Sequence, residues 1–105
     1  MRPVTLTRAE AVRRIEDAEA EIRSLGVRRL ALFGSVLRDE ASPGSDVDLL
    51  IEFAPGAKSF DRLLAIADLL EARLGMPVEL VTLEALSPFI GPRILAQAED
   101  VLRAA

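Results

Sequence analysis

Three short groups of residues combine types that could handle a phosphate and a metal ion. The first is Gly34-Ser35, which follows an apolar run ending at Phe33. Glycine lets a backbone approach a ligand closely, and a helix beginning at Ser35 would direct free N–H groups and a positive dipole end at an anion. An ordinary strand-to-helix turn also uses such a pair. Gly34-Ser35 therefore indicates a phosphate site only when other phosphate- or metal-binding groups accompany it.

The second group is the aspartate pair in Ser45-Asp46-Val47-Asp48-Leu49. Its alternation predicts a strand, and strand side chains two apart point to the same face. Carboxylates so close repel each other unless a cation lies between them, and Mg²⁺ commonly takes one or two carboxylates together with substrate phosphates. An isolated Asp-x-Asp also occurs on solvated sheet faces.

Glu79 is the third candidate, a lone acid in the short apolar segment 78–81. It would lie beside Asp46 and Asp48 if its strand neighbours theirs. Otherwise it faces solvent or pairs with an arginine.

We expect a small α/β (α+β) domain spanning residues 1–105 to position these groups. Apolar periodicity, caps and turn formers predict helices over residues 7–25, 59–74 and 92–102, strands over 28–33, 46–53 and 77–81, and a short helical turn from Ser35. This order predicts a mixed sheet of three to four strands with helices packed mainly on one face.

Composition excludes several kinds of chemistry. The chain has no Cys and no His, which removes Cys/His zinc sites, Cys nucleophiles and Ser-His triads. Its net charge of −4 argues against direct nucleic-acid binding. No apolar run approaches the roughly 20 residues that span a bilayer, so we expect a cytoplasmic protein without a membrane partner. The chain also has no Tyr, so any tyrosine it modifies lies on another molecule.

The two motifs together are far more specific than either alone. Gly34-Ser35-Val36-Leu37-Arg38, followed within a dozen residues by Ser45-Asp46-Val47-Asp48-Leu49, resembles the signature of the DNA polymerase β-like nucleotidyltransferase superfamily. The strand with Glu79 and the stretch from Thr82 to Pro88 extend the resemblance to its minimal nucleotidyltransferase (MNT) domains. The resemblance covers nearly the whole chain and implies the nucleotidyltransferase fold.

The resemblance also implies residue roles. Four residues would bind ATP or another NTP, with the first two holding the β- and γ-phosphates: Gly34, Ser35, Arg38 and Ser45. Three carboxylates would be catalytic and would hold two Mg²⁺ ions: Asp46, Asp48 and Glu79. Glu79 would also accept the proton of the attacking hydroxyl.

The chain departs from the family pattern at two positions. Glu79 stands where relatives usually have Asp, and its extra methylene moves the carboxylate outward by about 1.5 Å. Asp39 stands where relatives often have Gly. Arg38 matches the family position, yet pairing with Asp39 or Glu40 is an equally open interpretation.

MNT domains of this kind are typically paired with a small helical HEPN protein in a toxin–antitoxin system. The implied function is transfer of AMP from ATP to a tyrosine of a HEPN toxin, by a protein that acts as antitoxin. An impaired MNT antitoxin that neutralises a HEPN RNase by binding alone is the alternative, and a plain structural domain is the third interpretation. Nucleotide choice and self-association into a homo-oligomer are left open.

Overall fold

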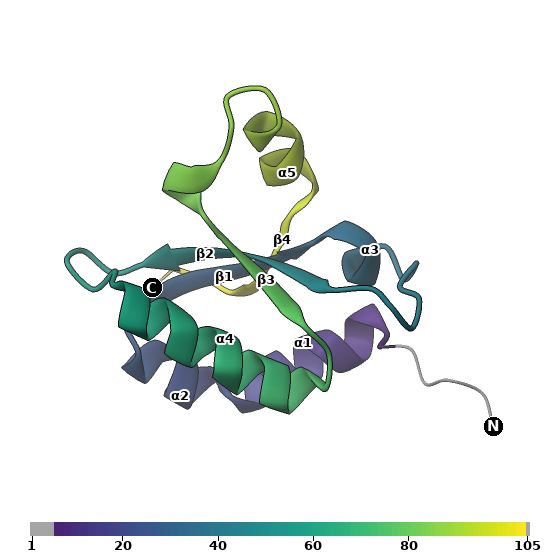
Figure 1. The fold of residues 1–105 in the computed structure, drawn as a ribbon, viewed down its shortest axis with the longest axis horizontal. Helices are drawn as coiled ribbons and strands as arrows, with labels where there is room; N and C mark the ends of the chain where they lie inside the picture. Colours follow the sequence, from purple (N-terminus) through teal and green to yellow (C-terminus); the bar gives the residue numbers. More distant parts are fainter. Residues whose placement is uncertain (1–5, 105) are drawn as a thin grey trace.

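The computed structural model describes residues 6–104, which form a four-stranded mixed sheet flanked by helices (Figure 1). The strands are β1 (Val27–Phe33), β2 (Val47–Phe53), β3 (Val78–Thr82) and β4 (Glu99–Leu102), in the order β3-β2-β1-β4. β1 runs antiparallel to β2 and β4, whereas β2 and β3 are parallel. The expected fold class is therefore confirmed, and each of the three expected strands lies within one residue of its predicted bounds.

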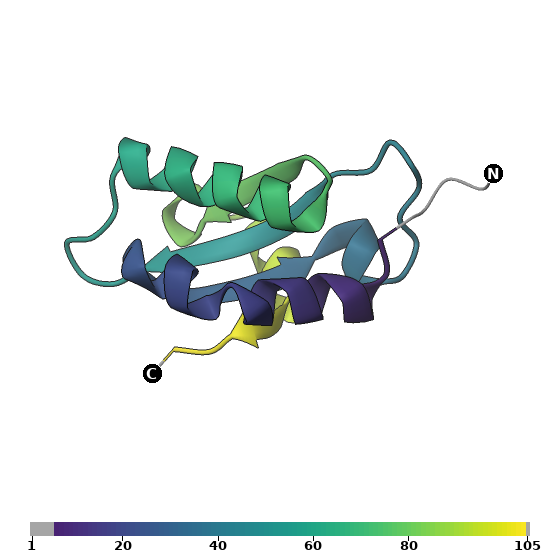
Figure 2. The ribbon, with the colours of Figure 1, turned by 90° about the horizontal axis from the view of Figure 1, so that it is seen from below.

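Three helices cover one side of the sheet, which we call the helix face (Figures 1 and 2). They are α1 (Arg8–Asp17), α2 (Glu19–Ser24) and α4 (Phe60–Leu74). The core between the two layers is built from aliphatic side chains that are buried in the structure: Ile15, Ile22, Leu30, Leu32, Leu49, Ile51, Ile66 and Leu70. Alternation along β1 and β2 directs these strand residues toward the helices.

The single helix predicted over residues 7–25 is wrong, because the chain forms two helices that meet at Ala18. Ala18 is buried, and its N–H donates to the carbonyl of Ile15 in a tightened turn. Ile15 and Ile22 are both fully buried on either side of this turn. Packing on the sheet therefore breaks a helix that periodicity alone would continue.

The long helix α4 begins and ends where its capping residues predict. Ser59 Oγ accepts a hydrogen bond of 3.1 Å from the Arg62 N–H, satisfying a free donor of the first turn. Gly75 ends the helix with a φ of 71°, a left-handed conformation that glycine adopts without a Cβ penalty. This stop turns the chain into β3, the strand that carries Glu79.

The last helix predicted over residues 92–102 is also wrong in its second half. Helix α5 (Gly91–Gln97) ends at Ala98, and residues 99–102 form β4 on the outer edge of β1. Leu102 pairs with Leu30 and is buried in the main core. Pairing with the free edge of β1 and burial of Leu102 override the local helical pattern.

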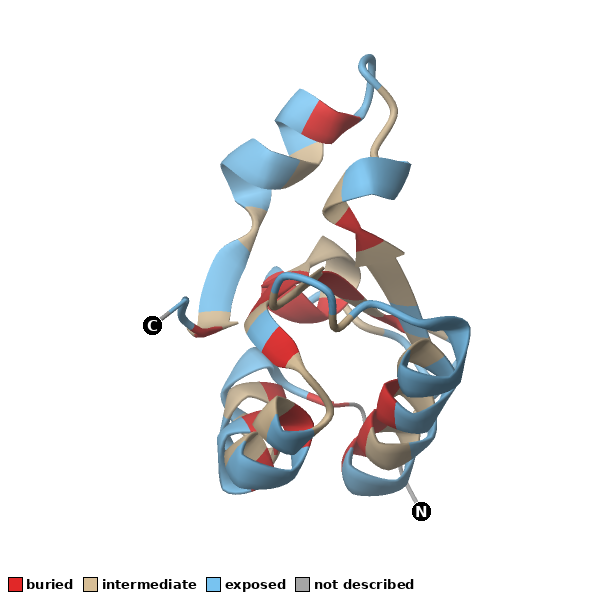
Figure 3. Ribbon diagram, turned by 90° about the vertical axis from the view of Figure 1, so that its left-hand side faces the viewer, coloured by how far each residue is buried: buried red, intermediate tan, exposed pale blue. Residues whose placement is uncertain are grey.

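The chain between β3 and β4 stands on the other side of the sheet, which we call the open face (Figure 1). We call residues 83–98 the arm; it contains a 3-10 turn, η1 (Leu83–Ala85), and α5. Most of the arm is exposed, as the pale blue ribbon in Figure 3 shows. Within residues 6–104 every helix falls short of the length and apolar character needed to cross a bilayer.

Candidate active site

The turn from β1 into the short helix α3 (Gly34–Leu37) is built tightly against β2. Gly34 has a φ of 78°, which a residue with a side chain rarely adopts. A Cβ at this position would lie 2.1 Å from Oδ2 of Asp48. Phe33 is the register partner of Asp48, so the turn lies directly over this carboxyl. Only glycine fits between them, and half-buried Ser35 follows in the first turn of α3.

Asp48 and Glu79 lie side by side on neighbouring strands. They are register partners in the parallel β2–β3 pair, and a side-chain hydrogen bond joins them. Partial burial, this hydrogen bond and the negative charges of Glu79 and Asp46 raise the pKa of Asp48 from 3.8 to about 6. Carboxylates held this close repel each other, which favours the protonated form of Asp48 unless a cation lies between them. The expected juxtaposition of Glu79 with Asp48 is confirmed.

Asp46 lies just outside the strand that was expected to include it, because β2 begins at Val47. It is exposed, and it acts on Asp48 through its charge. Among residues 6–104, no three acidic side chains are gathered closely enough to form a ready metal cage. The site residues therefore comprise a contacting pair, Asp48 and Glu79, with Asp46 at its margin.

Arg38 forms the ion pair that the sequence left open, and its contact with a phosphate stays a prediction. Its Nε donates to Glu40 at 3.1 Å in an exposed ion pair. Its positive charge also lowers the pKa of Asp48, opposing the acidic neighbours. Ser45 instead serves its own loop, since its Oγ accepts a 2.9 Å hydrogen bond from the Ser42 N–H.

Asp39 has a structural role that sequence reasoning missed. It is the non-glycine residue with a positive φ, 54°, within residues 6–104. Its Oδ1 accepts a 2.7 Å hydrogen bond from the Arg8 N–H, a donor in the first turn of α1 that has no acceptor within the helix. Asp tolerates the left-handed region better than most residues, and here it ties the loop before Asp46 to α1. The sequence signal that could have revealed this role is that Asp39 stands where relatives often have Gly.

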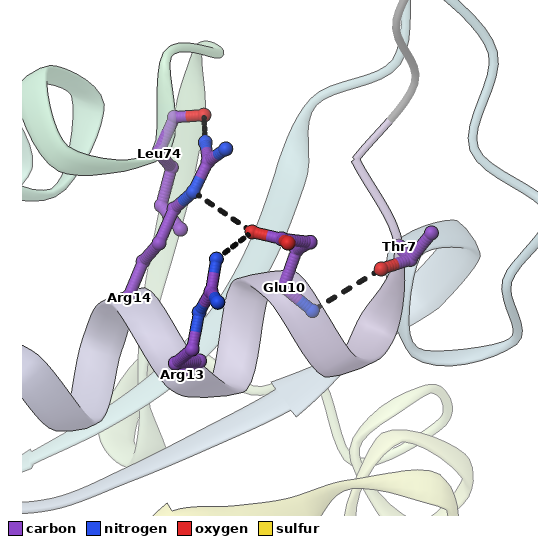
Figure 4. Close-up of polar contacts among 5 residues, drawn as sticks. All are labelled: Thr7, Glu10, Arg13, Arg14 and Leu74. Carbon is purple, nitrogen blue, oxygen red and sulfur yellow. Dashed lines mark hydrogen bonds and ion pairs between the residues drawn. The ribbon is translucent and has the colours of Figure 1, made fainter.

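The carboxyl pair lies on an open surface rather than in a deep pocket. A cavity of about 480 Å³ lies elsewhere, between the start of α1 and the end of α4. Its polar groups already serve one another, because Glu10 pairs with Arg13 and Arg14 while Arg14 donates to the Leu74 carbonyl (Figure 4). Thr7 Oγ1 accepts a hydrogen bond from the Glu10 N–H and caps the start of α1.

This arrangement suits chemistry on a phosphate chain. The N–H groups that follow Gly34 and the Ser35 hydroxyl are donors for phosphate oxygens. The adjacent carboxyl pair provides hard oxygen ligands for a divalent cation and a proton acceptor. A glycine-serine turn after one strand and carboxylates on the next two strands define an α/β protein of the nucleotidyltransferase class.

A family model described as "nucleotidyltransferase domain" matches residues 12–101, and the chain belongs to this family. It is 34% identical over 97 residues to the protein adenylyltransferase MntA of Thermococcus cleftensis, covering 92% of this chain and 96% of that protein.

Solved structures share the fold. One of them, whose description as a minimal nucleotidyltransferase is provisional, superimposes on this chain with a TM-score of 0.78 at 30% identity. The match covers 90% of this chain and 95% of the other. A chain from the complex of tri-AMPylated Shewanella oneidensis HEPN toxin with MNT antitoxin gives a TM-score of 0.62 at 19% identity, covering 89% of this chain and 73% of the other. At that identity the second likeness shows the fold alone.

Proposed function

We propose that this protein is a Mg²⁺-dependent adenylyltransferase that transfers AMP from ATP to a tyrosine hydroxyl of a HEPN toxin and thereby acts as its antitoxin. The observation that carries the proposal is the Asp48–Glu79 carboxyl pair packed against Gly34, where a Cβ would lie 2.1 Å from Asp48. A triphosphate bound at the turn would lie next to acids able to hold its metal ions.

The residues present fit a divalent cation at the carboxyl pair. Partial burial and the neighbouring acids Glu79 and Asp46 raise the pKa of Asp48 to about 6, and a cation at the pair would replace its proton. We assign two Mg²⁺ ions to Asp46, Asp48 and Glu79, with remaining ligands from substrate phosphates. Such ions supply charge stabilisation for the departing pyrophosphate and orient the attacking oxygen.

The chain's own residues then position the reactants. Gly34 and Ser35 bind the β- and γ-phosphates, and Arg38 and Ser45 complete the nucleotide contacts. The acceptor oxygen attacks the α-phosphorus, the bond from that phosphorus to the bridging oxygen of the β-phosphate breaks, and pyrophosphate leaves. Glu79 accepts the proton of the hydroxyl. Positioning and charge stabilisation dominate such transfers, so few side chains suffice.

The choice of acceptor rests on the relatives. The Thermococcus relative is named a protein adenylyltransferase, and the Shewanella complex contains a tri-AMPylated HEPN toxin with its MNT antitoxin. This chain has no Tyr, which agrees with an acceptor in trans. We place this reaction in the cytoplasm and treat residues 1–105 as one catalytic domain, with self-association left open.

Transfer from labelled ATP tests the proposal. Wild-type protein, Mg²⁺ and a purified HEPN protein should yield label on a HEPN tyrosine, and Asp48→Asn should yield far less. Folded wild-type protein that labels no HEPN protein would end the enzyme claim.

Binding without catalysis is the second candidate, and the exposed Glu79 in place of the family's Asp favours it. If it is correct, Asp48→Asn will inhibit the HEPN RNase as well as the wild type does, without label in either case. Under the adenylyltransferase proposal Glu79→Asp keeps activity, whereas Glu79→Gln lowers it because the proton acceptor is lost.

A further inference from the structure

The arm carries three exposed large apolar side chains, Phe89, Ile90 and Leu95, which we call the arm patch. Their exposed fractions are 88%, 58% and 45%. Large apolar side chains grouped on a surface mark an interaction site more often than isolated ones do. Phe60 on α4 is a comparable case elsewhere, 72% exposed and on the helix-face layer.

The arm holds Phe89 outward by specific contacts. Ser87 Oγ accepts a 3.1 Å hydrogen bond from the Phe89 N–H, and the Ser87 carbonyl accepts one of 2.6 Å from the Gly91 N–H. Gly91 is buried against Leu86, where an added Cβ would lie 3.1 Å from the Leu86 Cβ. The turn is therefore built, and a partner would meet a preformed surface with less ordering cost.

The arm stands on the same side of the sheet as the carboxyl pair. Val47, Leu49 and Ile51 point into the main core, so Asp48 and its register partner Glu79 point to the open face. Figure 1 places η1 and α5 above this face, opposite α1, α2 and α4. A protein lying against the arm would thus lie on the same side of the sheet as Asp48 and Glu79.

The site needs such a second wall. Glu79 is exposed, Asp48 is half-buried, and neither lines either of the two cavities described for residues 6–104. The hydroxyl acceptor lies on another molecule under the proposed function. A single partner protein would then both complete the site and cover the arm.

Charge also favours an apolar partner surface on the arm. Between Leu86 and Ala98 the only ionisable side chain is Arg93, in a chain of net charge −4. This segment has no acidic side chain, so an apolar partner surface can pack on it without desolvating a carboxylate.

We propose that the arm patch is the docking surface for the acceptor protein, which packs an apolar surface on Phe89, Ile90 and Leu95 beside its acceptor hydroxyl. This inference rests on the proposed function for the identity of the acceptor, a HEPN protein. The patch acts by recruitment, so its residues affect the concentration of acceptor required rather than the chemistry.

The experiment compares Phe89→Ser with the matched control Phe60→Ser. Binding of a purified HEPN protein is measured by calorimetry, and labelled AMP transfer is measured over a range of HEPN concentrations. Phe89→Ser should weaken HEPN binding and raise the KM for HEPN by about tenfold or more, the scale of an aromatic anchor, and Phe60→Ser should stay within about twofold. The KM for Mg²⁺–ATP and the unfolding midpoint should not change in either variant.

Equal effects of the two variants, or no effect of Phe89→Ser, would overturn the docking proposal. A wild-type chain that does not bind HEPN protein would overturn it too. If Phe89→Ser instead breaks a homodimer seen by light scattering and leaves HEPN binding intact, a second copy occupies the patch and the proposal is wrong. Binding without transfer, still lost in Phe89→Ser, would refute the enzymatic function alone.

Discussion

The two faces of the sheet differ in almost every physical respect. On the helix face, Val47, Leu49 and Ile51 are at most 1% exposed and join a continuous aliphatic core. On the open face, the same strand presents Asp48, whose pKa is raised beside its register partner Glu79. Over residues 47–49, core packing and the chemistry of the site therefore fall on alternate residues, because the side-chain period of a strand is two. Further along β2, Leu50 on the open face is itself buried, at 2% exposed.

The open face tolerates two neighbouring carboxyl groups, Asp48 and Glu79, which an apolar core would not. Asp48, whose pKa is raised to about 6, lowers the stability of the folded chain when it is charged. The helix face provides the burial that offsets this cost. The difference between neighbouring residues of β2 can be tested directly, and the following experiments are ordered from the largest expected effect to the smallest.

Substitutions at adjacent positions of β2 should have opposite consequences. Asp48→Asn should reduce AMP transfer by about 100-fold or more, because a metal ligand worth several kcal/mol is lost, while stability changes by less than about 1 kcal/mol. Leu49→Ala should lower the free energy of unfolding by about 2–5 kcal/mol, because Leu49 is fully buried. Transfer assays and urea denaturation measure the two effects. Similar stability losses in both variants would contradict the division of the faces.

Gly34→Ala should abolish Mg²⁺–ATP binding and lower the free energy of unfolding by about 1–3 kcal/mol, from left-handed strain and the contact with Asp48. Gly56→Ala is the matched control, since Gly56 has a φ of 77° and nothing within 4 Å of an added Cβ. The difference between the two variants isolates the contact with Asp48. A Gly34→Ala protein that binds nucleotide normally would remove the turn from the site.

Mg²⁺–ATP affinity should rise with pH through about 6, because Asp48 must release its proton to bind a cation. The pKa of Asp48 is raised on folding, so its contribution to stability without metal is most favourable below 3.8 and is lost as pH rises through about 6. Calorimetry and urea denaturation between about pH 5 and 7 measure both trends. Asp48→Asn should flatten them, and a wild-type affinity independent of pH would oppose the assignment.

Asp39 offers the finest test, because it supports the site loop without facing a substrate. Asp39→Ala should cost about 1–2 kcal/mol of unfolding free energy, since it loses the bond to the Arg8 N–H and tolerates a φ of 54° poorly. Asp39→Asn keeps an acceptor and tolerates this φ, so it should cost less than about 1 kcal/mol. Asp39→Gly removes the strain together with the bond and should fall between them. Equal stability of all three variants by urea denaturation would mean that the Asp39–Arg8 hydrogen bond does not stabilise the fold.

Much of the fold could be predicted from local signals. Ser59 and Gly75 bound α4 as their cap chemistry predicts, and the alternation of residues 47–53 identifies both faces of β2. The break at Ala18 and the switch from helix to strand at Ala98 could not be predicted. Both depend on where the sheet lies, since packing and edge pairing decide between local conformations of nearly equal energy.

The sequence by itself determined the types of groups in the site and their order, because a glycine-serine turn and alternating aspartates are local features of the chain. Only the tertiary structure decided that Glu79 lies next to Asp48, since parallel pairing of β2 and β3 joins residues that are distant in sequence. The tertiary structure also placed the arm above the same face. Strand pairing sets register through long-range hydrogen bonds and burial, and a one-residue shift would have moved Glu79 to the opposite face.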